Sequence, residues 1–187
     1  YWRQELTIYD VRVVEKKGIL LNEKEFLPHE VVYRLPPQIS DAGTRVEQVR
    51  RDLERLVQMG VNVIRLEGTG TGAEGVNCSE VRTFYSLCRK RGFLTGDLWI
   101  RPENLPVYRG LPGETTCQAL LAADGRTLTE RYYYYQAKWS SEPVLYPVLS
   151  TLHRQENGLL SLTIYSNQKK VVLYLSLIHI SEPTRLG

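Results

Sequence analysis

The chain has 187 residues, and its 42% hydrophobic and 24% charged residues are an ordinary balance for a globular protein. A formal net charge of +3 is too small to indicate binding to nucleic acid or to a membrane surface, and no apolar run approaches the ~20 residues that span a bilayer. The three cysteines lack metal-ligand spacing, so they predict neither a disulfide framework nor a zinc site.

The first predicted elements are β-strands. Apolar residues alternating with charged ones predict a strand over residues 6–14. A glycine turn and a short apolar run follow, and they predict a hairpin that turns at Asn22 and Glu23. A second short apolar run covers residues 29–33, and two prolines then predict a loop.

A helix–strand–helix–strand segment is the clearest part of the chain. A capping box at Thr44 begins the first helix, whose apolar stripe continues up to Gly60. A buried strand follows at residues 61–66, and Asn77 begins a second helix that leads to another strand at residues 93–100. The short connections predict parallel strands joined by right-handed crossovers.

The sequence changes in character after residue 100, where three prolines and two glycines over residues 102–113 predict a connector. Apolar and aromatic residues then recur on one helical face over residues 128–139, which predicts a short amphipathic helix. From residue 143 onward, three β-like runs separated by polar turns are typical of an antiparallel sandwich.

The sharpest local motif is the Gly-rich loop at residues 68–73, which matches the G-x-G-x-x-A pattern of a dinucleotide site. Asp97 ends the next strand, roughly where such a site keeps its ribose-binding acid. Arg65 is charged within the strand, Glu67 would face the pyrophosphate, and the helix is predicted near Ser79 instead of beside the glycines. These features favour an ordinary loop over a dinucleotide site.

Other polar residues give weaker predictions. Arg65, Glu67 and Asp97 lie at the carboxyl ends of predicted parallel strands, where α/β folds place their sites. The tyrosines of residues 132–135 could stack on sugar rings, but packing of a helix on a core is the favoured interpretation. The three histidines lack partners with metal-ligand spacing and are expected on the surface or in loops: His29, His153 and His179.

Several segments resemble one known family in a consistent order. "YDVRVVEKKGILLNEKEF" is similar to the junction between an immunoglobulin-like domain and a catalytic barrel, and "RRDLERLVQMGVNVIRL" to the first barrel helix and second strand. "FYSLCRKRGFLTGDL" resembles the second helix and third strand, "RYYYYQAKWSSEPVLY" the helix leaving the barrel, and "LTIYSNQKKVVLYL" the β-sandwich that follows. The family is glycoside hydrolase family 2, which includes β-galactosidases, β-glucuronidases and β-mannosidases.

This resemblance implies an α/β plus β fold. The expected parts are an incomplete (β/α)8 TIM-barrel segment of about three strands and two helices, and part of an immunoglobulin-like β-sandwich. The implied domains are the end of an immunoglobulin-like domain at residues 1–17, the barrel segment at 18–100, a connector or deletion junction at 101–127, a barrel-exit helix at 128–142 and the start of a sandwich at 143–175.

The family resemblance also implies an activity, which is hydrolysis of terminal β-glycosidic bonds by a retaining mechanism with two glutamates. Too few residues separate the third-strand match at Asp97 from the exit-helix match at Arg131 to hold strands four to eight. Both catalytic glutamates are therefore expected to be missing and the chain to be inactive. Arg65 and Asp97 match pocket positions that would contact the carbohydrate substrate of the parent enzyme, and neither a cofactor nor a metal is implied.

Two alternatives stay open. One is a non-catalytic carbohydrate-binding or structural module, which predicts sugar binding through Tyr135 or Trp139. The other is a small dinucleotide-binding domain centred on residues 68–73, which a second helix starting several residues after Gly72 would exclude.

The end of the chain resembles a sequence of another origin. Residues 175–185 read "LSLIHISEPTR", which is the translation of a transposase sequencing adapter without a mismatch. Residues 176–187 are therefore predicted to be an adapter-derived tail that takes no part in the fold. His179 and Glu182 accordingly enter no functional argument.

Overall fold

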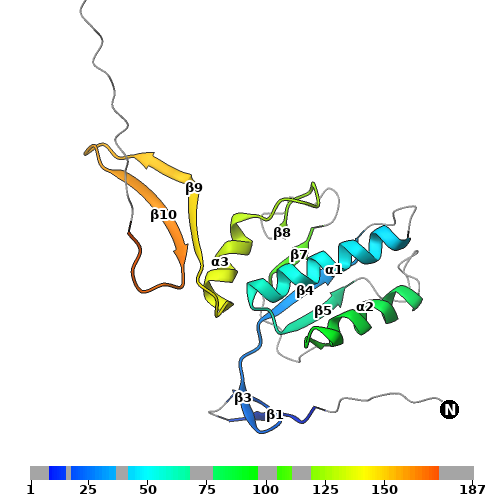
Figure 1. Ribbon diagram of the computed structural model, residues 1–187. Coiled ribbons are helices and arrows are strands. Elements are labelled where there is room, and N and C mark those ends of the chain that lie inside the picture. Colours follow the sequence, from blue (N-terminus) through cyan, green and yellow to red (C-terminus); the bar gives the residue numbers. More distant parts are fainter. Residues whose placement is uncertain are drawn as a thin grey trace, which may run out of the picture.

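The computed structural model describes residues 9–15, 18–36, 42–67, 78–96, 105–110 and 119–172. Within these ranges the chain forms a small antiparallel sheet, a five-stranded parallel sheet with helices, and an antiparallel strand pair after the last helix (Figure 1). The predicted combination of α/β structure with additional β structure is thus confirmed. No helix in the described ranges is long and apolar enough to cross a lipid bilayer.

The small antiparallel sheet contains the predicted hairpin. Its strands are β1 (Val11–Val14), β2 (Gly18–Leu21) and β3 (Lys24–Phe26), in that order. The turn between β2 and β3 has positive φ angles at Asn22 (49°) and Glu23 (68°), as in a type I′ turn, which favours asparagine followed by glycine. The Asn22 side chain accepts a hydrogen bond from the Asp10 backbone N–H at 3.0 Å, so the turn also holds the start of β1.

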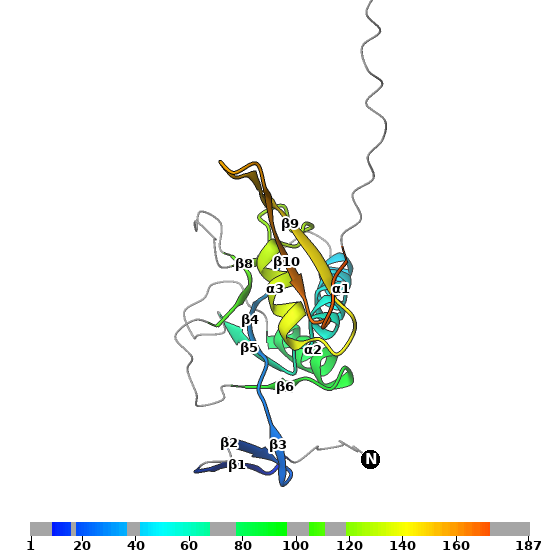
Figure 2. The same ribbon diagram turned by 90° about the vertical axis from the view of Figure 1, so that its left-hand side faces the viewer.

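The five-stranded sheet is parallel throughout and has the order β6-β5-β4-β7-β8. Its strands are β4 (Glu30–Arg34), β5 (Val63–Glu67), β6 (Leu94–Thr95), β7 (Val107–Arg109) and β8 (Ala119–Leu121). Helix α1 (Ala42–Met59) connects β4 to β5, and α2 (Cys78–Lys90) connects β5 to β6. Both helices lie on the same side of the sheet (Figure 2), as successive right-handed crossovers require.

The expected number of about three parallel strands is too small. Strands β7 and β8 lie within residues 101–127, which the sequence predicts as a connector, and they extend the sheet beyond β4. Each strand has only three residues, too few for an alternating pattern to be recognised among the prolines and glycines of this region.

The core lies between the parallel sheet and its helices. Helix α1 buries one apolar stripe: Val49, Leu53, Leu56 and Met59. Phe84 on α2 stacks on Tyr33 of β4 with ring centroids 4.9 Å apart, and Ile64 of β5 is fully buried beside them. Each buried side chain of this size contributes about 1.5–3 kcal/mol, so this layer fixes both helices on the sheet.

The ends of α1 differ in how well the sequence predicts them. The helix begins at Ala42, two residues before the predicted cap, so Thr44 lies inside the first turn and the capping-box prediction is wrong. Its C-terminal end is as predicted, because Gly60 follows with φ +86°. A Cβ at Gly60 would lie 2.3 Å from the Trp139 carbonyl oxygen, so glycine also permits α3 to approach.

Helix α3 (Glu130–Trp139) confirms the predicted amphipathic helix and joins the strand pair β9 (Leu145–Arg154) and β10 (Leu160–Ser166) to the parallel sheet. The Tyr132 hydroxyl donates a hydrogen bond to the Arg55 carbonyl of α1 at 2.7 Å. Tyr133, the next residue of α3, stacks on Tyr146 of β9 with ring centroids 3.8 Å apart. Aromatic contacts therefore hold α3 between the two sheets.

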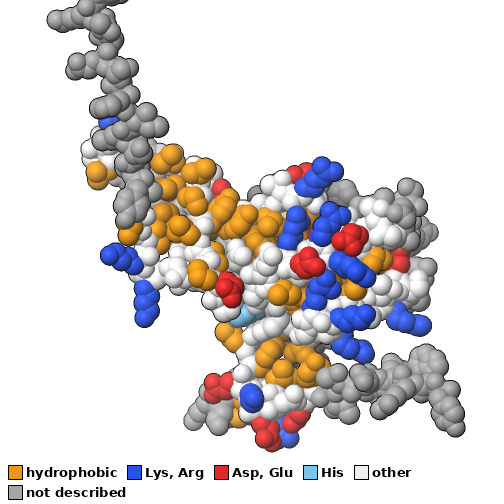
Figure 3. All heavy atoms as spheres, viewed as in Figure 1, with side chains coloured by type: hydrophobic (Ala, Val, Ile, Leu, Met, Phe, Trp, Pro, Cys, Tyr) orange, Lys and Arg blue, Asp and Glu red, His pale blue; other side chains and the backbone are white. Residues whose placement is uncertain are grey.

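The β9–β10 pair forms only part of the sandwich that the sequence predicts. No strand is present at residues 169–172, the described part of the third β-like run, and residues 173–175 lie outside the described ranges. Apolar side chains gather over this pair (Figure 3). Five leucines are between 52% and 68% exposed: Leu145, Leu149, Leu152, Leu159 and Leu160.

Candidate functional site

The parallel sheet carries charged side chains on the face turned away from α1 and α2. Because strand residues alternate between two faces, the pairing of β4 with β5 places one set of polar residues together: Glu30, Arg34, Arg65 and Glu67. We call these four residues the charged sheet face. The other face carries Val31, Tyr33 and Ile64, all fully buried under the helices.

The most buried contact of this face is the ion pair between Glu30 and Arg65. The Arg65 Nη2 atom lies 2.7 Å from the Glu30 Oε1 atom, and the two side chains are 18% and 4% exposed. Glu30 begins β4 and Arg65 lies at the centre of β5, so the pair joins two adjacent strands of the sheet. Removing one partner would leave the other charge buried, which typically destabilises a protein by about 3–5 kcal/mol.

A second ion pair lies at the carboxyl ends of the same strands. The Arg34 Nε atom donates to the Glu67 Oε2 atom at 2.6 Å, and Arg34 Nη1 reaches the Arg109 carbonyl at 3.4 Å. Arg34 is largely buried, whereas half of the Glu67 side chain is exposed. Three neighbouring strands are therefore linked at the edge where α/β folds place their sites.

The two carboxylates of the charged sheet face are far apart. Glu30 pairs in register with Val63, whereas Glu67 pairs with Arg34, four residues further along β4. At about 3.3 Å per residue, their backbones are separated by roughly 13 Å along the strands. A retaining glycosidase needs two carboxyl groups about 5–5.5 Å apart, so Glu30 and Glu67 do not form such a pair.

The predicted site residues are only partly brought together. Arg65 and Glu67 belong to the charged sheet face, but each is bound to a charge of the chain itself. Asp97 and the Gly-rich loop at residues 68–73 lie outside the described residues. Helix α2 begins at Cys78, well after Gly72, so a phosphate at the glycines would lack the adjacent helix N-terminus. This start counts against the alternative of a dinucleotide site, which the sequence already made the less favoured interpretation.

A second polar cluster lies inside the core, around the Asp52 carboxylate of α1. Its oxygens accept hydrogen bonds from the Tyr33 hydroxyl and the Tyr108 hydroxyl, both at 2.9 Å. Arg109 Nη2 donates to the same carboxylate at 3.0 Å, and the Asp52 side chain is only 2% exposed. One carboxylate thus connects α1 with β4 and β7.

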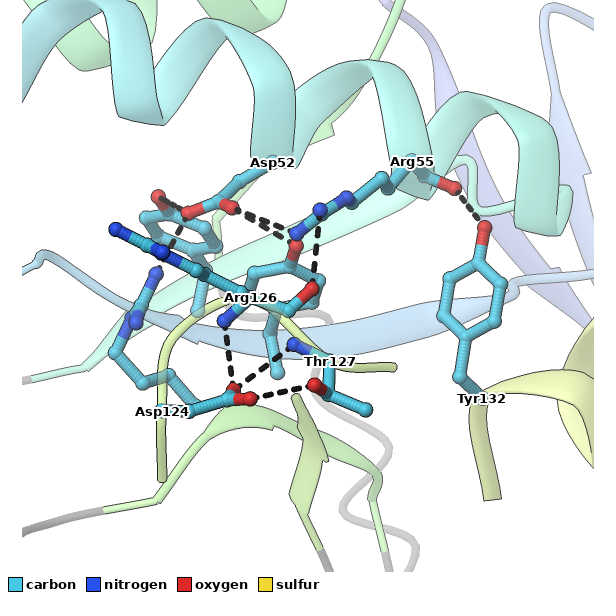
Figure 4. Close-up of polar contacts among 9 residues, drawn as sticks. Asp52, Arg55, Asp124, Arg126, Thr127 and Tyr132 are labelled. Carbon is cyan, nitrogen blue, oxygen red and sulfur yellow. Dashed lines mark hydrogen bonds and ion pairs between the residues drawn. The ribbon is translucent and has the colours of Figure 1, made fainter. Parts of the chain in front are cut away.

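Arg55 connects the Asp52 cluster to the segment before α3 (Figure 4). Its guanidinium lies 3.9 Å from the Asp52 carboxylate, and it donates to the Arg126 carbonyl at 3.2 Å. Asp124 orders the same turn by accepting hydrogen bonds from the backbone N–H groups of Arg126 and Thr127. A hydrogen bond from the Thr127 hydroxyl, with these two, lowers the pKa of Asp124 to about 2.

The Asp52 cluster has a structural role. Burial, followed by the nearby Asp52 charge, raises the pKa values of Tyr33 and Tyr108 well above the usual value for tyrosine. Both hydroxyls therefore stay protonated and donate to Asp52 at neutral pH. Because three donors bind the carboxylate and its side chain is only 2% exposed, Asp52 is not accessible to a substrate as a general base.

His29 and Cys88 are also engaged in the packing of the fold. The His29 ring stacks on Trp139 with centroids 5.1 Å apart, and its Nδ1 atom lies 2.8 Å from the Gly60 carbonyl oxygen. Burial raises the pKa of the Cys88 thiol to about 12, so it is not a nucleophile at neutral pH. Among the described residues, no group of three His, Cys, Asp or Glu side chains could hold a metal ion.

Two of these features were not predicted from the sequence. Asp52 follows an arginine pair in a charged helix and has the sequence signature of a solvated residue. Only the assembled sheet brings Tyr33 and Tyr108 to it. The Glu30–Arg65 pair did have a signal, because opposite charges stand in two adjacent strands that are otherwise apolar.

Comparisons with known proteins give no family for this chain. A scan against protein-family models matches none of them, and a search of curated proteins finds no match.

Proposed function

We propose that this chain is a shortened version of a family 2 retaining β-glycosidase. Its complete form would carry the remaining barrel strands between Asp97 and Arg131, together with both catalytic glutamates. The chain as it stands would not hydrolyse glycosides, because a retaining mechanism requires a nucleophile and an acid/base on opposite sides of the bond.

The observation that carries this proposal is the charged sheet face. In a doubly wound sheet, helices cover both faces and the central strands are apolar on both. In a (β/α)8 barrel the helices lie outside, and the inner face ends in the active site at the carboxyl ends of the strands. Strands β4 and β5 have one apolar face under α1 and α2 and one face with two ion pairs, which favours a barrel origin.

The first elements support the same proposal. A β-hairpin precedes β4, and the sequence β4-α1-β5-α2-β6 then places three strands side by side with both helices on one side (Figure 2). This is the arrangement expected for the beginning of a barrel. Strands β7 and β8 depart from it, because the order β6-β5-β4-β7-β8 reverses at β4 as in a doubly wound sheet, whereas a barrel places its fourth strand beside the third. The exposed leucines of β9 and β10 are what one sheet of an immunoglobulin-like sandwich would present without its second sheet.

Arg65 has a specific place in this proposal. In the complete enzyme it would contact the sugar, as the family resemblance implies, whereas here its guanidinium is bound to Glu30 at 2.7 Å. In the complete enzyme, Asp97 would lie at the end of the third barrel strand. The charged sheet face is therefore proposed as a remnant of a substrate pocket without catalytic power.

A hydrolysis assay tests the proposed inactivity. The purified chain is incubated with 4-nitrophenyl β-D-galactoside, β-D-glucuronide and β-D-mannoside, and release of 4-nitrophenol is followed by absorbance. We expect no release above that of the variant Glu67→Gln, since Glu30 and Glu67 are too far apart to act together. Turnover by the unmodified chain on any of the three substrates would refute the proposal.

A further inference from the structure

A cleft beside α3 leads to an inference that does not depend on glycosidase ancestry. Its volume is about 710 Å³, within the range of small-molecule sites. Helix α3 forms most of its wall, and β8 and β10 complete it. The charged and aromatic side chains that line it are Glu130, Arg131, Tyr134, Tyr135 and Tyr165.

Arg131 supplies a cation that has no ion-pair partner among the described residues. Its guanidinium lies over the Tyr135 ring, 5.7 Å from the ring centroid, and its Nε atom is buried without a hydrogen-bond partner. A planar guanidinium in a partly enclosed site favours a carboxylate, which can accept two parallel N–H bonds.

The aromatic side chains add flat surfaces beside this cation. The Tyr134 and Tyr165 rings meet edge to face with centroids 5.4 Å apart, and Tyr134 is 37% exposed. Lys138 Nζ lies 4.5 Å from the Tyr134 ring centroid, which adds a second positive charge near the cleft. Such rings favour a ligand that has a ring of its own.

Glu130 restricts the ligand further. Its carboxylate accepts a hydrogen bond from the Ser150 hydroxyl at 2.7 Å, which fixes one of its oxygens. The rest of the carboxylate can accept from a ligand hydroxyl but would repel a second acidic group. The ligand should therefore carry one carboxylate and at least one hydroxyl.

We propose that this cleft binds a small hydroxylated ring compound with a single carboxylate. The carboxylate pairs with Arg131, the ring lies against Tyr134 and Tyr165, and a hydroxyl donates to Glu130. Two sources share this chemistry, the hydroxylated aryl acids and the sugar acids.

Isothermal titration of the full chain with 4-hydroxybenzoate and with D-glucuronate distinguishes these sources. We expect at least one acid to bind saturably with a Kd below about 1 mM, which corresponds to about −4 kcal/mol. The neutral analogues, 4-hydroxybenzyl alcohol and D-glucose, should bind at least tenfold more weakly. Binding of one acid only identifies the source, and saturable binding of neither acid refutes the proposal.

Variants locate the site. Arg131→Gln should weaken binding of the acid at least tenfold, and Arg131→Lys, which keeps the charge but loses the planar fork, should have an intermediate effect. Arg82→Gln, at an exposed arginine of α2, is the matched control and should leave the affinity unchanged. Equal affinities for acid and neutral analogue, or an unchanged affinity in both Arg131 variants, would overturn the assignment.

Discussion

Replacing Asp52 with asparagine removes the charge that connects α1 to the parallel sheet while keeping the size of the side chain. In the unmodified chain, the carboxylate accepts from Tyr33, Tyr108 and Arg109 at 2.9–3.0 Å. The asparagine oxygen can still accept from one tyrosine. Its NH2 group, however, would face donors, so at least one buried donor loses its partner.

The magnitude follows from these contacts. A net hydrogen bond to a charged group contributes about 1.5–3 kcal/mol, and breaking a buried ion pair costs about 3–5 kcal/mol. Since asparagine keeps part of the network, we expect Asp52→Asn to lower the free energy of unfolding by about 3 kcal/mol. With a urea m-value of about 2 kcal/mol/M, the unfolding midpoint should fall by about 1.5 M.

Urea unfolding followed by circular dichroism measures this shift. Glu54→Gln is the matched control, because Glu54 lies on the same helix, is 62% exposed and pairs with Arg91 at 3.1 Å. Exposed pairs of this kind contribute little, so its free energy of unfolding should change by no more than about 0.5 kcal/mol. Equal midpoints for the two variants would show that the Asp52 network does not stabilise the fold.

Three further substitutions or conditions test other parts of the structure. Gly60→Ala should lower the free energy of unfolding by about 3 kcal/mol, because Gly60 has φ +86° and a Cβ there would lie 2.3 Å from the Trp139 carbonyl oxygen. Gly92→Ala, at φ +80° with open space around it, should lower it by only about 1 kcal/mol. Equal decreases for the two variants in urea unfolding would contradict the close approach of Trp139 to Gly60. Glu23→Gly should stabilise the hairpin turn by about 1 kcal/mol, because Glu23 has φ 68° in a turn that favours glycine, and an unchanged or lower unfolding midpoint would argue against the turn. Burial raises the pKa of Tyr132 to about 12. The protonated hydroxyl therefore adds stability that is fully present below the unfolded pKa of about 10 and is lost as the pH rises through about 12. Tyr132→Phe should make the alkaline decline in the unfolding midpoint shallower, and an unchanged decline would be evidence against this burial.

The sequence predicts the long elements well and the short ones poorly. Helix α1 repeats its apolar stripe over several turns, so its existence and its end at Gly60 follow from the pattern. Strands β7 and β8 have three residues each, and their pairing with β4 and with each other depends on contacts across the sheet that no local pattern encodes. The strand count was therefore too low.

The candidate sites show the same division between local and long-range information. The order of elements predicts that Arg65 lies in a parallel strand, but the structure places it at the centre of β5 and not at the carboxyl end. Its ion pair with Glu30 requires the register of β4 against β5. The cleft beside α3 combines residues of α3, β8 and β10. Tyr135 is predicted from the sequence as a possible sugar contact and does line this cleft, whereas the equally predicted Trp139 packs on His29.

Sequencing of independently prepared genomic DNA across codons 97–131 tests the proposed origin of the chain most directly. The proposal predicts a longer reading frame there, with an Asn-Glu pair after a fourth strand and a second glutamate after a seventh. It also predicts a coding sequence after codon 174 that differs from "LSLIHISEPTR". A frame that runs uninterrupted through these codons, as in the present sequence, would contradict the proposal.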